Sequence, residues 1–282
     1  MISEAELRRR AATWDVDPMV VDLDYSLGWF AAALYAANEN SNCLHFKGGT
    51  CLRKCYFGDY RFSEDLDFTA TARFDVEKLR RWIENAAGWS VKHGGPNYEA
   101  APWRVETLSD TYGDETYQVR VYYRGPLQWA GSPRAIRLDV TRDEVLLSRS
   151  VTRELIHPYS DVDALLAPGI ACYSLEEILA EKLRAVGGQR RFAVSRDLYD
   201  IHQLVQAGVA ISDVVPLVPA KFIAKGLDPA RVNLGRIEAR RAEFERDWER
   251  RLSYLVRGGT DFEAAWATTI DVLRQLQSHH SV

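Results

Sequence analysis

The clearest pattern along the chain is an alternation of hydrophobic and polar positions that begins after residue 100. Residues 117–125 and 135–142 alternate with a period of two, and residues 102–108 follow the same pattern less strictly. Such alternation is typical of strands with one buried face. Two shorter segments also predict strands: the apolar residues 44–46, and residues 65–70, in which Leu66 and Phe68 alternate with polar positions.

Elsewhere the apolar positions recur at helical spacing. Before residue 100, helices are predicted over 3–12, 18–40, 50–57 and from Val76 to a glycine stop at Gly88. After residue 150 the strand signals fade, and helices are predicted over 174–186, 195–208 and 238–256. This change predicts an α+β protein, with a mixed sheet flanked by helices in residues 1–165 and a helical domain in residues 166–282.

The amino-acid composition excludes few classes of protein. The chain is 46% hydrophobic and 27% charged, which is ordinary for a globular protein. No apolar run approaches the roughly 18 residues that span a bilayer, and the charged N-terminus lacks the apolar region of a secretory signal, so we expect no membrane association and a cytoplasmic location. With a net charge of −4, any contact with nucleic acid must come from a local basic patch. The five basic residues between 182 and 196 are the candidate patch, and a solvated basic loop is the alternative.

Three aspartates carry the strongest chemical signal. Asp65 and Asp67 stand two apart on a predicted strand, so both side chains point to the same face. Two carboxylates held so close repel each other unless a cation lies between them. Asp139 stands on the polar side of another strand and offers a third metal ligand, or a base for an attacking hydroxyl. The pattern favours Mg²⁺; the alternative is that these aspartates face solvent.

A glycine turn precedes the aspartate pair. Gly48, Gly49 and Thr50 directly follow a short strand and begin a predicted helix. Glycines let backbone N–H groups approach phosphate oxygens, and a helix N-terminus favours anions. We interpret this turn as a cradle for a nucleoside triphosphate, with Arg53 and Ser63 as further candidate contacts. It is not a Walker A loop, because the GK[ST] ending is absent.

The helical half adds three charged candidates. Lys182 falls on the apolar stripe of the helix 174–186, where a lysine needs a partner or must extend to the edge of the face. Asp197 and Asp200 are three residues apart and border the apolar stripe of the next helix. An ion pair with a neighbouring arginine such as Arg196 is the structural alternative for these aspartates.

These motifs resemble a known family. The glycine turn, the helix and the Asp-x-Asp strand resemble the nucleotidyltransferase superfamily that includes polymerase β. More narrowly, KGGTCLRKCYFG, RFSEDLDF and the later EKLRA and SRDLYD look like the AbiEii/MenT nucleotidyltransferase toxins of bacterial toxin–antitoxin systems. The distinctive motifs cover residues 44–70 and 175–202. The gap of fifteen residues between Gly49 and Asp65 is slightly longer than is usual in the superfamily, although the narrower family tolerates it.

The resemblance implies a specific activity. It implies a nucleotidyltransferase fold, transfer of a nucleotide from a nucleoside triphosphate to the 3′ end of RNA, with tRNA as the acceptor, and a cognate antitoxin as partner. It implies that Lys182 contacts the nucleotide, so that the helical domain completes the active site. It also implies one essential aspartate in SRDLYD, and the sequence leaves Asp197 and Asp200 equally eligible. Two other functions stay open, which are transfer to a protein hydroxyl and nucleotide binding without catalysis.

The spacing of the four cysteines does not predict a metal site. Cys51 and Cys55 lie four apart on one predicted helical face, but no further zinc ligands follow at short spacing. We therefore expect Cys43, Cys51, Cys55 and Cys172 to be reduced and partly buried thiols.

Overall fold

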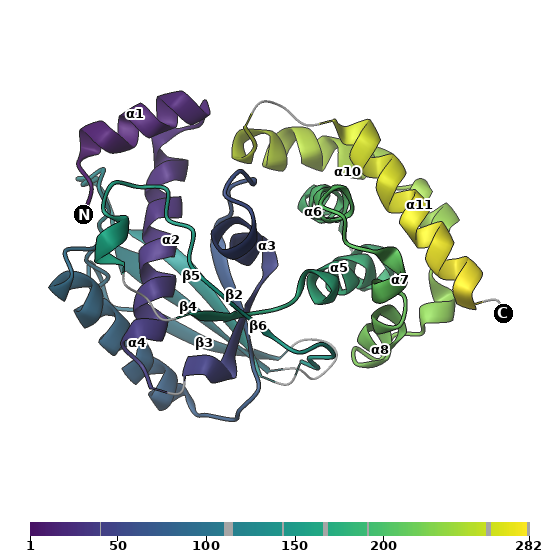
Figure 1. Ribbon diagram of the computed structural model, residues 1–282, viewed down its shortest axis with the longest axis horizontal. Coiled ribbons are helices and arrows are strands. Elements are labelled where there is room, and N and C mark those ends of the chain that lie inside the picture. The colour runs from purple at the N-terminus through teal and green to yellow at the C-terminus, as the bar shows by residue number, and fades with distance from the viewer. Residues whose placement is uncertain are drawn as a thin grey trace. The chain divides into compact units, whose positions relative to one another are not determined.

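The computed structural model of the chain describes residues 1–39, 41–109, 115–142, 144–165, 169–190, 192–257 and 261–280 (Figure 1). It divides into two compact units. The first comprises Met1–Glu144 and Ser150–Cys172, and the second comprises Val145–Arg149 and Tyr173–Val282. Among the described helices, none combines the length and the apolar character that spanning a bilayer requires.

A mixed sheet forms the centre of the first unit. Its seven described strands follow the order β3-β4-β5-β2-β1-β7-β6. β2 is parallel to β5 and β1 is parallel to β7, while the other neighbours are antiparallel. The strands are β1 (Leu44–Lys47), β2 (Asp65–Ala70), β3 (Arg104–Ser109), β4 (Glu115–Tyr123), β5 (Arg134–Thr141), β6 (Val151–Arg153) and β7 (Ile170–Cys172). The predicted α+β class with a mixed sheet is confirmed.

The helices of the first unit begin at good caps. Ser3, Asp17 and Asp75 each accept a hydrogen bond from a backbone N–H of the first turn, which satisfies one of the free donors there. The helices are α1 (Glu4–Trp14), α2 (Pro18–Ala36), α3 (Gly48–Cys51) with its π-helical continuation Leu52–Tyr56, α4 (Val76–Lys92), and the 3₁₀-helices Ser41–Cys43 and Val162–Ala164.

The predicted stop of α4 at Gly88 is wrong. The helix continues to Lys92, and the chain turns at Gly94, whose φ of +78° suits glycine. Gly88 is exposed and nothing lies within 4 Å of the position that a Cβ would take. It is therefore a tolerated helix residue rather than a cap.

One face of the sheet is apolar and is covered by α2 and α4 (Figure 1). The ring of Tyr35 on α2 lies 6.3 Å from that of Phe68 on β2. Phe74 packs on Trp82 of α4 at 5.0 Å and on Tyr117 of β4 at 6.1 Å. Full burial of each such side chain contributes about 1.5–3 kcal/mol. The alternation along the strands leaves the other face polar, and this face carries the predicted aspartates.

The structure adds two short strands that the sequence pattern did not indicate. β6 and β7 pair with each other, and β7 pairs with β1 through Phe46 and Cys172. Strands of three residues are too short to show a period. Residues 170–172 were predicted to lie in the helical domain, but they belong to the sheet of the first unit.

The second unit is helical. Its elements are α5 (Leu175–Arg184), the π-helix Ala185–Gln189, α6 (Ser195–Gln206), α7 (Ile211–Val214), α8 (Leu217–Ile223), the 3₁₀-helix Pro229–Arg231, α9 (Leu234–Glu238), α10 (Arg241–Asp247), the π-helix Trp248–Leu252, the 3₁₀-helix Ser253–Leu255 and α11 (Phe262–His280). Ser174 caps α5. The Glu177 carboxylate accepts hydrogen bonds from Leu147 and Ser148 N–H at 3.0 and 2.7 Å and pairs with buried Lys221 at 2.5 Å.

A buried ion network anchors the helix that follows the glycine turn. Asp24 on α2 is 1% exposed. Arg53 Nε lies 2.5 Å from its Oδ1, and Lys54 Nζ lies 2.7 Å from its Oδ2. The Tyr159 hydroxyl donates to Oδ2 at 2.7 Å. Burial by itself would raise the pKa of Asp24, but the two cations hold it well below its usual range.

Replacing Asp24 with asparagine should lower the free energy of unfolding by about 3–5 kcal/mol, because two buried cations lose their counter-charge. Since the pKa of Asp24 is lowered in the folded state, its contribution is present above the ordinary carboxyl pKa of about 4 and is lost as the pH falls through the lowered pKa. Urea unfolding at pH 7 and at about pH 3 measures both effects: the difference between the wild type and the variant should be smaller at pH 3 but still present, because the lowered pKa lies below that pH.

Glu4→Gln is the matched control. Glu4 pairs with Arg8 at 2.7 Å on the exposed side of α1, and exposed pairs contribute about 0–1 kcal/mol. A loss in Asp24→Asn no larger than that of the control would show that the buried network does not hold this part of the fold.

Candidate active site

The three predicted aspartates lie on the polar face of the sheet, on adjacent strands. In the parallel pairing of β2 with β5, Asp67 is opposite Asp139 and Asp65 is opposite Arg137. Residues opposite each other on neighbouring strands project from the same face. Asp65, Asp67 and Asp139 are each partly exposed, so their oxygens remain accessible to a ligand.

Local contacts position Asp65. Arg137 Nη2 lies 3.2 Å from its Oδ2, and the Ser63 hydroxyl lies 3.5 Å from its Oδ1. The Thr50 hydroxyl donates to the backbone oxygen of Asp65. Thr50 is 1% exposed, so its hydroxyl ties the start of α3 to β2.

Asp139 is held by its neighbour on β4. Gln118 is opposite Asp139 in the register, and its Nε2 donates to Asp139 Oδ1 at 3.1 Å. Burial raises the pKa of Asp139, and the charge of Asp65 adds to this effect, while the Gln118 hydrogen bond and Arg137 oppose it. The pKa of Asp139 is therefore raised mainly by burial and secondarily by the charge of Asp65, and a bound cation would favour the charged form of both carboxylates.

The glycine turn packs directly against this row of carboxylates. Gly48 has a φ of +74°, and a Cβ built there would lie 2.5 Å from Asp67 Oδ2. A Cβ at Gly49 would clash with the guanidinium of Arg61. The first position therefore requires glycine for its backbone conformation and its close approach to Asp67, whereas a side chain at the second would have to displace the Arg61 guanidinium. Arg61 therefore borders the turn.

Arg53 does not have the position that a phosphate contact requires. It is 2% exposed, and its guanidinium pairs with Asp24, donates to the backbone oxygen of Tyr60 and lies 3.7 Å from the ring centre of Phe62. A long side chain one turn into a helix points either to the ligand or to the core, and sequence spacing does not distinguish the two. We therefore leave Arg53 out of the candidate site.

The donor set of this face suits a hard divalent cation. Carboxylate oxygens are the ligands that Mg²⁺ prefers, and Asp65, Asp67 and Asp139 supply them from two adjacent strands. Asp65 is paired with Arg137, so a cation at this carboxylate competes with that arginine. Nucleotide phosphates would complete the coordination, as is usual for Mg²⁺ in enzymes that act on nucleotides.

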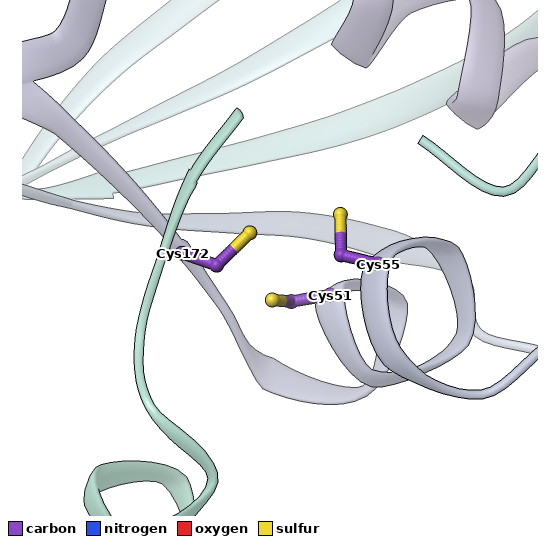
Figure 2. A group of neighbouring side chains, drawn as sticks. All are labelled: Cys51, Cys55 and Cys172. Atoms are coloured by element: carbon purple, nitrogen blue, oxygen red, sulfur yellow. The ribbon is translucent and has the colours of Figure 1, made fainter. Parts of the chain in front are cut away.

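Three cysteines form a second, chemically different group in the first unit (Figure 2). The sulfurs of Cys51, Cys55 and Cys172 lie within 4.8 Å of one another, and all three residues are buried. Cys51 and Cys55 come from the helix after the glycine turn, and Cys172 comes from β7. The sequence had offered no third ligand at short spacing; β7 supplies one from more than a hundred residues away. Burial raises the pKa of Cys51, as expected for a protonated thiol in an apolar setting.

In the second unit, Lys182 is paired with both predicted aspartates. Its Nζ lies 2.7 Å from Asp197 Oδ1 and 2.8 Å from Asp200 Oδ2. The aspartates are 1% and 0% exposed. Burial would raise the pKa of Asp197, but Lys182 and Arg190 lower it overall. The lysine on the apolar stripe therefore has the partner that its position requires.

The basic segment 182–196 is not an open patch. Lys182 and Arg190 are paired with Asp197, and Arg184 is 6% exposed. Arg191 lies outside the described residues. Counting charges along the sequence did not reveal that acidic residues of α6 neutralise this segment.

Comparison with known proteins agrees with this fold and identifies the family. An open polar face bearing paired carboxylates beside a glycine turn is what a nucleotidyltransferase requires, and a family profile identifies the class. Residues 32–268 match the profile of the nucleotidyl transferase AbiEii toxins of type IV toxin–antitoxin systems, and the chain belongs to this family. The protein is therefore a nucleotidyltransferase toxin, and its family implies a nucleotide substrate and an antitoxin partner. The AbiEii identification made from the motifs is confirmed.

One solved structure has the same fold. MenT4, a nucleotidyltransferase toxin from Mycobacterium tuberculosis H37Rv, is similar with a TM-score of 0.60 and 21% sequence identity, covering 98% of this chain and 100% of that chain. An antigenic nucleotidyltransferase-like protein from Paracoccidioides brasiliensis aligns with a TM-score of 0.33 and 16% identity, covering 80% of this chain and 95% of that chain. No curated protein sequence matches the chain.

Gly48→Ala tests the packing of the turn. We expect a loss of more than about 1 kcal/mol in the free energy of unfolding, because alanine is strained at this φ and its methyl group meets Asp67. Chemical unfolding followed by circular dichroism measures it.

Gly88→Ala is the control, since it makes the same change at an exposed helical position with open space around it. It should raise the free energy of unfolding by about 0.5–1 kcal/mol. Changes of equal sign and size in the two variants would contradict the packing described here.

Proposed function

We propose that the protein transfers a nucleoside monophosphate from a nucleoside triphosphate to the 3′ end of RNA, with tRNA as the acceptor and Mg²⁺ as the cofactor. One observation carries the proposal: Asp67 is opposite Asp139, and Asp65 is on the same face, next to a turn that only glycine can form. The choice of RNA is supported by the AbiEii/MenT resemblance of the motifs.

We assign two roles to the three carboxylates, which are metal binding and proton acceptance. Asp65, Asp67 and Asp139 would hold Mg²⁺, which would neutralise charge on the phosphates and orient them. Asp139 is also suited to accept the proton of the attacking 3′ hydroxyl, because its carboxylate is partly exposed and lies on the same face as the other two aspartates. Gln118 positions Asp139 through the hydrogen bond to Oδ1.

The triphosphate is assigned to the turn at Gly48, Gly49 and Thr50. Backbone N–H groups of the first helical turn lack intrahelical acceptors and can bind phosphate oxygens. Ser63 stays a candidate contact, since its hydroxyl is at the edge of the carboxylate row. Lys182 is assigned to neutralising charge that develops on the phosphates, and Asp197 and Asp200 to holding its ammonium group in place.

A cellular consequence follows from this reaction. Extra nucleotides at the 3′ end of tRNA would prevent aminoacylation and block translation, which is how a toxin of this class would stop growth. The reaction needs nucleoside triphosphates and tRNA, so we assign it to the cytoplasm. The antitoxin implied by the family would control it.

A transfer assay tests the proposal. Purified protein is incubated with Mg²⁺, each α-³²P-labelled nucleoside triphosphate in turn and total RNA, and RNA and protein are then resolved on a gel. We expect label in a tRNA-sized band with one or two of the nucleotides. Label on protein would replace RNA with a protein hydroxyl as acceptor, and nucleotide binding without any label would indicate a non-catalytic module.

Asp65→Ala should reduce the transfer rate by at least about a thousandfold, because the metal and the phosphates lose a ligand. The free energy of unfolding should change little, since Asp65 is partly exposed and the loss of its pair with Arg137 is offset by the loss of repulsion from the other carboxylates. Initial rates and urea unfolding are measured together. Asp163→Ala, at an exposed position of the first unit, is the control, and full activity in Asp65→Ala would rule out the metal assignment.

A further inference from the structure

Three arginines lie side by side on the polar face of the sheet. Arg137 on β5 is opposite Arg120 on β4, and Arg120 is opposite Arg104 on β3. The same row begins with Asp65, which is opposite Arg137. All three arginines are exposed. At a strand spacing of about 4.8 Å, they extend over about 10 Å from the carboxylates toward the edge of the sheet.

This row is unfavourable for the folded protein by itself. Like charges directly opposite each other on neighbouring strands destabilise a sheet. Arg137 has Asp65 as a partner, but within the described residues neither Arg104 nor Arg120 has a carboxylate at ion-pair distance. The acidic residue of β3 on this face, Glu106, is opposite Gln118 in the next row. Adjacent like charges that lower the stability of a sheet are expected where the residues serve a function.

The strand order places the arginine row on one side of the carboxylates and the glycine turn on the other. In the strand order, β5, β4 and β3 follow β2 on one side, while β1 and the turn at Gly48 are on the other side. The carboxylates therefore separate the turn assigned to the triphosphate from the arginines. Asp139, assigned to the acceptor hydroxyl, stands on β5, which is the strand that carries the first arginine of the row.

We propose that Arg137, Arg120 and Arg104 bind consecutive phosphates of the acceptor RNA strand and guide its 3′ end toward Asp139. Guanidinium groups bind phosphate through paired hydrogen bonds. The roughly 10 Å from the first to the third arginine covers about three nucleotide steps of a stacked strand at about 3.4 Å each, so the row is long enough to contact a segment of three to four phosphates. The inference rests on the proposed transfer to RNA and names the surface that binds the acceptor.

The test is the double variant Arg104→Gln/Arg120→Gln. Binding of a fluorescently labelled tRNA with a free 3′ hydroxyl is measured by anisotropy over a range of salt concentrations, and KM is measured for tRNA and for the nucleotide. The slope of log K against log salt should fall by about 0.7–0.9 for each arginine removed. KM for tRNA should rise about tenfold or more, and KM for the nucleotide should not change.

Arg9→Gln/Arg81→Gln is the matched control, because it removes the same charge from exposed positions on α1 and α4. It should leave the salt slope and both KM values as in the wild type. Arg120→Glu separates binding from folding, since a glutamate between two arginines is a favourable cross-strand arrangement. This variant should unfold at the same or a higher denaturant concentration and yet bind tRNA more weakly.

The outcomes separate this inference from the proposed function. If the wild type labels RNA but Arg104→Gln/Arg120→Gln has the salt slope and KM of the control, the arginine row does not bind the acceptor. If Arg120→Glu unfolds more easily, the row has a structural role. If the wild type neither binds nor labels RNA and labels protein instead, both the proposed function and this inference are overturned.

Discussion

The polar face of the sheet depends on the absence of a side chain at Gly48. β1 and β2 are antiparallel, so the chain leaves β1 next to Asp67 and turns at once into α3. The turn needs a φ of +74°, and the carboxylate of Asp67 fills the space in which a Cβ would lie. One residue therefore fixes both the direction of the helix and the place of a proposed metal ligand, because backbone and carboxylate share the same space.

Charge is organised across the strands of this face rather than along the chain. One row contains Lys47, Asp67, Asp139 and Gln118, and the next contains Asp65, Arg137, Arg120 and Arg104. The aspartates lie at the centre, with the three arginines extending toward β3 on one side and Lys47 on β1 on the other. A net charge of −4 for the whole chain hides this separation, which is what an enzyme that joins a nucleotide to a polyanion would need.

Buried polar contacts make the turn rigid. Arg53 is tied to Asp24 on α2, and the Thr50 hydroxyl is tied to β2. Both residues were candidates for phosphate contacts, and both instead hold the segment that bears Gly48 and Gly49. A buried charge is stable only with a partner, so a cation within the first turns of a buried helix is more often part of such a network than free for a ligand.

The sequence by itself determined the class of fold, the strand β2 with both aspartates on one face, the glycine turn and the family. It could do so because the alternation of apolar residues in a strand, their spacing along a helix and a pair of adjacent glycines are all signals within a short stretch of sequence. Tertiary structure alone decided which strands are neighbours, and hence that Asp67 meets Asp139 and that Arg104, Arg120 and Arg137 form a row. It also decided that Asp197 and Asp200 both neutralise Lys182, and that Cys172 joins Cys51 and Cys55. Strand order and register arise from contacts between distant segments, which no local period encodes.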